Sequence, residues 1–108
     1  LKEGRGEELD LRQVRDMLAA SIEEDFGIHS EVVEERPDEI VVRCGRCPVY
    51  DSAAALGLDA ETIEAGCRAS AIGYMDAMAA ELKPGARYEL RRFRRSAETP
   101  CEEVLVLA

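Results

Sequence analysis

One short stretch of the chain predicts a direct passage from a β-strand into an α-helix. Residues 39–48 have the sequence EIVVRCGRCP, in which the β-branched run favours a strand. Pro48 suits the first position of a helix, because a proline lacks the backbone N–H that would stay unpaired there. Cys44 is therefore expected at the end of the strand, and Cys47 at the N-cap of the helix that follows. A strand followed so closely by a helix indicates a domain that contains both strands and helices.

The residues before this stretch predict a helix followed by another strand. Asp10 and Gln13 have the spacing of a capping box, and apolar residues then recur at helical spacing as far as Gly27, which suits a C-cap. Residues 28–34 are again rich in β-branched side chains and are joined to residues 39–44 by the turn sequence ERPD. The two strands are expected to form an antiparallel hairpin.

The residues after the stretch predict two helices and two closing strands. A short helix is expected over 49–56, and Asp59 is the expected N-cap of a long helix that stops at the sequence KPG. Residues 87–94 and 102–107 are expected to form a second hairpin. The long helix carries one stripe of mostly apolar residues, made of Ile63, Cys67, Ser70, Tyr74, Met78 and Leu82.

The fold class that follows is α+β, with the element order α-β-β-α-α-β-β. Two hairpins separated by helices can build one four-stranded antiparallel sheet with the helices packed on one face. The last strand contains the run VLVL, which is apolar on both sides, so we expect it to be central or covered by a partner. With 108 residues the chain is expected to form a single domain over 1–108, with flexible residues at 1–8.

The charge balance argues against polyanionic partners. The chain has 14 Lys and Arg against 23 Asp and Glu, and its net charge of -9 would repel phosphate backbones and anionic lipid headgroups. No apolar run is long enough to span a bilayer, and the N-terminal residues lack a signal-peptide core. We therefore expect a cytoplasmic protein that binds neither nucleic acid nor membranes.

The four cysteines are the most distinctive chemical feature of the sequence. Cytoplasmic cysteines are normally reduced, which favours metal ligands or reactive thiols over disulfides. The CxxC spacing lets two sulfurs face a common centre, and the other two cysteines fall near element ends, where they can join them. Four thiolates suit a zinc ion or an iron–sulfur cluster. The sequence thus predicts a metal site formed by Cys44, Cys47, Cys67 and Cys101.

Other interpretations of these cysteines stay open. A helix N-terminus favours a thiolate, so Cys47 is the candidate catalytic nucleophile. Cys44 and Cys47 could instead cycle between a dithiol and a disulfide. Cys67 lies on the apolar stripe of its helix, where a free cysteine behaves as a small hydrophobe, so simple burial also accounts for it.

Two arginines are candidates for ligand binding. Arg46 lies between the cysteines of the CxxC pair, and Arg92 lies in a basic strand. A guanidinium can bind a carboxylate or a phosphate through two parallel hydrogen bonds. The alternative is a solvated strand whose arginines pair with acidic helix surfaces.

The later part of the chain resembles a known family. The residues that carry the likeness are RCGRCP at 43–48, LGL at 56–58, Cys67, LKPGARYE at 82–89, and Cys101 ahead of an apolar strand. Over about residues 40 to 107 the chain resembles the L-2-amino-thiazoline-4-carboxylic acid hydrolase-like family, which is similar to the 4-vinyl reductase domain, a small-molecule-binding α+β module. The resemblance implies that Cys47, Cys67 and Cys101 belong to one site. It also implies a hydrolase that opens a C–N or C–S bond in a cyclic thiazoline or amide-like molecule.

The sequence leads to three functional hypotheses. The first is a domain whose four-cysteine site binds a metal, and with it a small ligand or a redox signal. The second is a hydrolase in which Cys47 or a metal-activated water attacks the substrate. The third is an accessory domain whose cysteines are merely buried. The apolar last strand also fits a homodimer.

Overall fold

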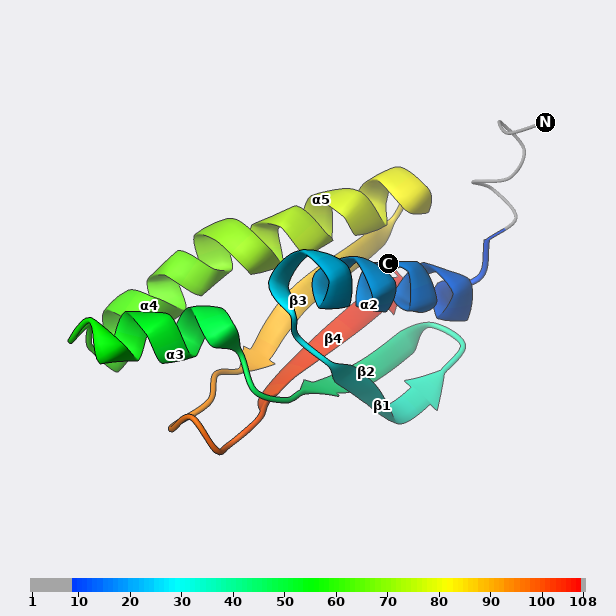
Figure 1. Cartoon of the computed structure of the whole chain (residues 1–108). Helices are drawn as coiled ribbons and strands as arrows, with labels where there is room; N and C mark the ends of the chain where they lie inside the picture. The colour runs from blue at the N-terminus through cyan, green and yellow to red at the C-terminus, as the bar shows by residue number, and fades with distance from the viewer. Residues whose placement is uncertain (1–8, 108) are drawn as a thin grey trace.

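The computed structural model describes residues 9–107 and has an α+β fold (Figure 1). The expectation of flexible residues at 1–8 lies outside the described part. The elements, in chain order, are α2 (Leu11–Phe26), β1 (Ser30–Arg36), β2 (Glu39–Cys44), α3 (Pro48–Ala55), α4 (Ala60–Cys67), η1 (Arg68–Ile72, a π-helical turn), α5 (Gly73–Leu82), β3 (Ala86–Arg92) and β4 (Cys101–Leu107).

The four strands form one antiparallel sheet in the order β1-β2-β4-β3. All helices of the described residues lie on the same face of this sheet, and the predicted fold class and element order are confirmed (Figure 1). The last strand is central, as its two-sided apolar sequence predicts. Leu105 is fully buried, and its neighbour Val104, which points to the opposite face, is only 6% exposed.

The helix boundaries are set by capping residues that were predicted from the sequence. The Asp10 side chain accepts a hydrogen bond from the Gln13 backbone N–H at 2.9 Å, and the Gln13 side chain accepts one from the Asp10 N–H at the same distance. Gly27 ends α2 in the left-handed conformation, with φ at 71°. Cys47 and Asp59 are the N-caps of α3 and α4, as predicted.

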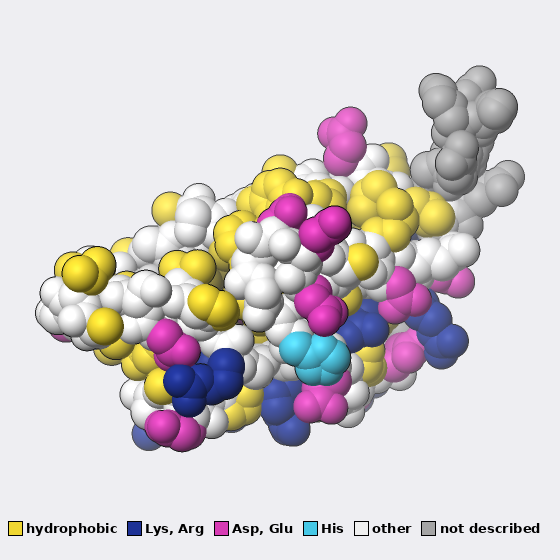
Figure 2. Space-filling view, in the orientation of Figure 1, with side chains coloured by type: hydrophobic (Ala, Val, Ile, Leu, Met, Phe, Trp, Pro, Cys, Tyr) yellow, Lys and Arg dark blue, Asp and Glu magenta, His cyan; other side chains and the backbone are white. Residues whose placement is uncertain are grey.

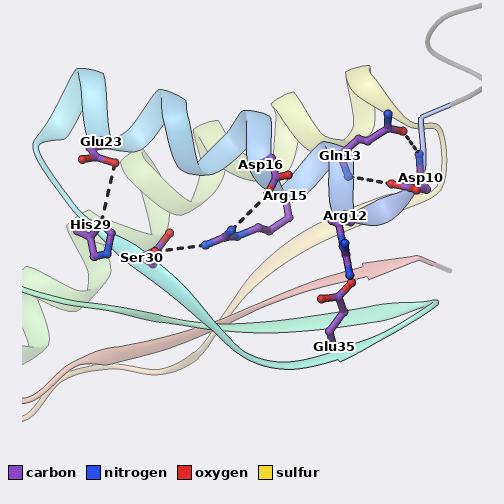
Figure 3. Close-up of polar contacts among 9 residues, drawn as sticks. All are labelled: Asp10, Arg12, Gln13, Arg15, Asp16, Glu23, His29, Ser30 and Glu35. Atoms are coloured by element: carbon purple, nitrogen blue, oxygen red, sulfur yellow. Dashed lines mark hydrogen bonds and ion pairs between the residues drawn. The ribbon is translucent and has the colours of Figure 1, made fainter.

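Two polar contacts hold α2 against β1 (Figure 3). Arg12 Nε donates to the Glu35 carboxylate at 2.8 Å, and Arg15 donates to the Ser30 carbonyl at 3.2 Å. Apolar residues at helical spacing on α2 face the sheet and are almost fully buried; they are Leu11, Val14, Leu18 and Ile22. The apolar face of α2, with its polar contacts at the edge, fixes this helix over the sheet.

The long helix predicted after Asp59 contains a π-helical turn, η1, between α4 and α5. The backbone N–H of Gly73 bonds the carbonyl of Arg68, five residues earlier, and the Ser70 hydroxyl donates to the Gly66 carbonyl at 2.6 Å. A π-turn accommodates one residue more than a regular α-helical turn and so rotates every later side chain. The predicted stripe is therefore wrong at Tyr74, which is 41% exposed, whereas Met75 beside it is 2% exposed.

The hydrophobic core lies between the sheet and the helices α2 and α5. Its largest fully buried side chains are Leu18, Ile40, Met75, Leu105, Val14 and Val42. α3, in contrast, contains no buried residue. Within residues 9–107, no helix combines the length and the apolar character needed to cross a membrane.

Candidate functional site

A cavity of about 370 Å³ lies between α3, the α4–η1 segment, the end of α2 and the ends of β2 and β4. Three of the five π-turn residues, those from Ser70 to Ile72, contribute to its wall. π-turns are frequent at functional sites. The rest of the wall is largely apolar and includes Ile22, Phe26, Ile63, Met75 and Phe93.

All four cysteines line this one cavity, and all four are free thiols. Cys44 and Cys101 are opposite each other in the β2–β4 register and are both buried. Cys47 is half-buried, and its sulfur accepts a hydrogen bond from the Tyr50 backbone N–H at 3.4 Å. Cys67 ends α4 and is also half-buried.

The predicted four-cysteine metal site, formed by Cys44, Cys47, Cys67 and Cys101, is wrong. No group of three or more His, Cys, Asp or Glu side chains in the described residues has a geometry that could hold a metal ion. The thiols come from four elements and are spread over the wall of a cavity, whereas zinc needs four sulfurs about 2.3 Å from one point. The CxxC spacing brings its residues to the same cavity without making them converge.

Burial keeps three of these thiols protonated near neutral pH. It raises the pKa of Cys44 far above its usual range, raises the pKa of Cys67 to about 12, and raises the pKa of Cys101. The Glu103 carboxyl is the second cause for both Cys44 and Cys67. A protonated thiol is a weak nucleophile, so these three side chains act as polarizable apolar surface.

Glu103 is a buried carboxyl in the cavity wall, and its side chain was not singled out by the sequence. It is 7% exposed, and the Tyr88 hydroxyl donates a hydrogen bond to it. Burial raises the pKa of Glu103, although Tyr88, Cys44 and Arg94 partly oppose this. Burial, the first cause, and the Glu103 charge also raise the pKa of Tyr88 well above its usual value. The Glu103 carboxyl therefore holds its proton more tightly in the folded protein than in water.

Arg94 is the positive group of the cavity wall. It follows β3 and is 4% exposed. Its guanidinium donates to the Gly45 carbonyl at 2.7 Å, to the Thr99 carbonyl at 3.2 Å and to the Cys101 sulfur at 3.2 Å. It also lies 5.6 Å from the centre of the Tyr50 ring, within the range of a cation–π contact.

The two arginines predicted to bind a ligand lie away from this cavity. Arg46 is exposed and pairs with Asp51 at 3.1 Å, with Glu98 at 3.9 Å. Arg92 is exposed and lies 3.8 Å from Glu102, in a separate arginine-lined hollow. The β3–β4 register shifts between Leu90 and Arg92, which ends the regular alternation of that strand. The catalytic role proposed for Cys47 stays a prediction.

Comparison with known proteins gives no significant match to a family model, to a curated protein or to a solved structure.

Proposed function

We propose that this domain binds a small, predominantly apolar molecule in the cavity beside η1. The observation that carries the proposal is the cavity itself, which combines an apolar wall with a small number of polar groups at its sheet end. Ligand pockets in proteins have this character, because the apolar wall supplies affinity and a few polar groups fix orientation.

The volume of the cavity limits the size of the ligand. Ligand pockets in proteins have volumes of about 300–1,000 Å³, so a cavity of about 370 Å³ is near the small end of that range. This size fits a medium-chain or single-ring compound.

The surface near the cavity is also apolar. Val49 on α3 and Leu58 after it line the cavity and are 55% and 47% exposed, and Leu56 between them is 81% exposed. Figure 2 shows hydrophobic side chains at the surface of the α3–α4 end, as well as at other places on this face. Exposed apolar residues grouped in one place are typical of binding sites rather than of an ordinary surface.

The resemblance of residues 40–107 to a family similar to the 4-vinyl reductase domain supports the same proposal, because that domain is a small-molecule-binding module. The residues of the resemblance that carry thiols, Cys47, Cys67 and Cys101, line the cavity.

Binding of a neutral probe tests the proposal. We expect the full chain to bind indole saturably in calorimetric titration, because indole is apolar and fits the volume. Ala71→Trp should weaken this binding by about tenfold or more, since Ala71 lines the cavity and a tryptophan would fill it.

The matched control is Ala69→Trp. Ala69 belongs to the same π-turn but is exposed and does not line the cavity, so indole binding should be unchanged. The proposal is contradicted if the wild-type chain binds none of indole, octanamide and octanoate. It is also contradicted if Ala71→Trp, shown by circular dichroism to be folded, binds indole as well as Ala69→Trp does.

A further inference from the structure

Among residues 9–107, Arg94 is a buried cation that forms no ion pair with a carboxylate. Exposed arginines of the same protein pair with carboxylates, for example Arg68 with Glu64 at 2.8 Å and Arg87 with Asp76 at 2.9 Å. Arg94 is far more buried, yet its hydrogen-bond acceptors among the described residues are two backbone carbonyls and a thiol sulfur. A buried charge normally has a counter-charge, because removing it from water is costly.

No carboxylate oxygen of the described residues lies within the 4 Å of an ion pair from the Arg94 guanidinium, whose acceptors are the Gly45 and Thr99 carbonyls and the Cys101 sulfur. Cys44, Cys67 and Cys101 are held as neutral thiols by burial, and burial also raises the pKa of Glu103. Arg94 is the only Lys or Arg among the described residues that line the cavity. The sheet end of the cavity therefore carries one positive charge that forms no ion pair with a described residue.

We infer that the ligand is a monocarboxylic acid whose carboxylate binds Arg94 and whose apolar body fills the rest of the cavity. A guanidinium has five N–H donors, and the three bonds of Arg94 leave two for a ligand. One negative charge balances one positive charge, which favours a carboxylate over a phosphate dianion. The inference rests on the proposed function and adds the chemical class of the ligand.

A matched pair of probes tests this without changing the protein. Octanoate and octanamide have nearly the same shape and differ in charge at one end. We expect the wild-type chain at pH 7 to bind octanoate about tenfold or more tightly than octanamide, because a charge-assisted hydrogen bond is stronger than a neutral one. Isothermal titration calorimetry measures both affinities.

A variant then tests whether Arg94 causes the tighter binding of octanoate relative to octanamide. In Arg94→Gln the ratio of the two affinities should fall to about one, whereas Arg91→Gln, an exposed arginine on β3, should keep the wild-type ratio. A purely structural role of Arg94 would lower stability and weaken both probes alike, leaving the ratio unchanged. If Arg94→Gln does not fold, the ratio of the octanoate and octanamide affinities of the wild-type chain alone tests the carboxylate inference.

The outcomes separate the inference from the proposed function. Octanamide binding as tightly as octanoate would overturn the carboxylate inference and leave the apolar ligand site standing. An acid preference that persists in folded Arg94→Gln would also overturn it. Failure of octanoate, octanamide and indole to bind would overturn both.

Discussion

At the scale of single residues, the most informative side chain is Glu103. A glutamate in a strand would ordinarily point to water, yet this one lies in the cavity wall, where Tyr88 donates a hydrogen bond to it. Because burial raises its pKa, the folded protein holds the Glu103 proton more tightly than the unfolded chain does. The contribution of Glu103 to stability is therefore greatest at low pH and falls as the pH rises above the unfolded pKa of about 4.3.

Glu103→Gln should remove this pH dependence. The amide oxygen can still accept the Tyr88 hydrogen bond, but no charge forms above the carboxyl pKa. We expect the free energy of unfolding of Glu103→Gln, relative to wild type, to rise from pH 4 to pH 8, at about 1.4 kcal/mol for each unit by which the pKa is raised. Urea unfolding at several pH values measures the difference.

Glu102→Gln is the control for this experiment. Glu102 is partly exposed and lies within 4 Å of Arg91 and Arg92, so neutralising it removes favourable pairs. The variant should show no gain at high pH. A Glu103→Gln protein whose relative stability stays flat between pH 4 and pH 8 would show that the pKa of the Glu103 carboxyl is not raised in the folded state.

At the scale of elements, one aspartate ties α5 to β3. The Asp76 carboxylate accepts hydrogen bonds from Arg87 at 2.9 and 3.2 Å and from the Tyr88 backbone N–H at 2.8 Å. The Arg87 and Tyr88 hydrogen bonds lower the pKa of Asp76. Its stabilising effect is therefore present above the unfolded pKa of about 3.9 and is lost as the pH falls through the lower, folded value.

Removing this tie should destabilise the protein. We expect Asp76→Ala to lower the free energy of unfolding by about 1–2 kcal/mol at pH 7, because a backbone N–H and an arginine both lose an ionised acceptor. Glu81→Ala, an exposed position on the same helix, should change stability by less than about 0.5 kcal/mol. Chemical denaturation compares them, and equal stabilities would refute the role given to Asp76.

Some features of these elements could be predicted from the sequence, and others could not. Caps at Asp10, Cys47 and Asp59 depend on neighbouring residues, and the two-sided apolar run of β4 reflects its central place, so these features were predicted. The π-turn was not, because an extra residue in one helical turn leaves no periodic signal of its own. Its presence displaced the apolar stripe of the helix by one position.

The candidate site was harder to predict for a related reason. The sequence singled out the cysteines because their residue type is rare, and all four do line the cavity. Sequence spacing does not fix the distances between side chains on four elements, so the metal site was wrong. Arg94 and Glu103 belong to predicted strands, and their contacts are with residues distant in the sequence, Gly45 for Arg94 and Tyr88 for Glu103.

At the scale of the whole molecule, stability is distributed unevenly. β2 and β4 are buried at the centre of the sheet, whereas α3 contains no buried residue and packs mainly against α4. We expect hydrogen exchange, measured by mass spectrometry, to be fastest in α3 among the helices and slowest in β4. Bound octanoate should slow the exchange of α3, whose residues line the cavity.

Equal protection of α3 and β4 in the free protein would contradict this expectation. Exposed α2 amides serve as the internal control, because α2 contributes only its last turns to the cavity wall and should change little when octanoate binds.

Because α3 has no buried residue, it is the helix most easily displaced when a ligand enters the cavity. Because α3 contributes no residue to the hydrophobic core, we expect it to move away from the cavity while the sheet and α2 keep their packing, so that a ligand enters without global unfolding. The speed of uptake should then be governed by local fraying and stay the same in variants that weaken the rest of the protein. The rate of ligand entry and the global stability of the fold are thus expected to vary independently in this protein.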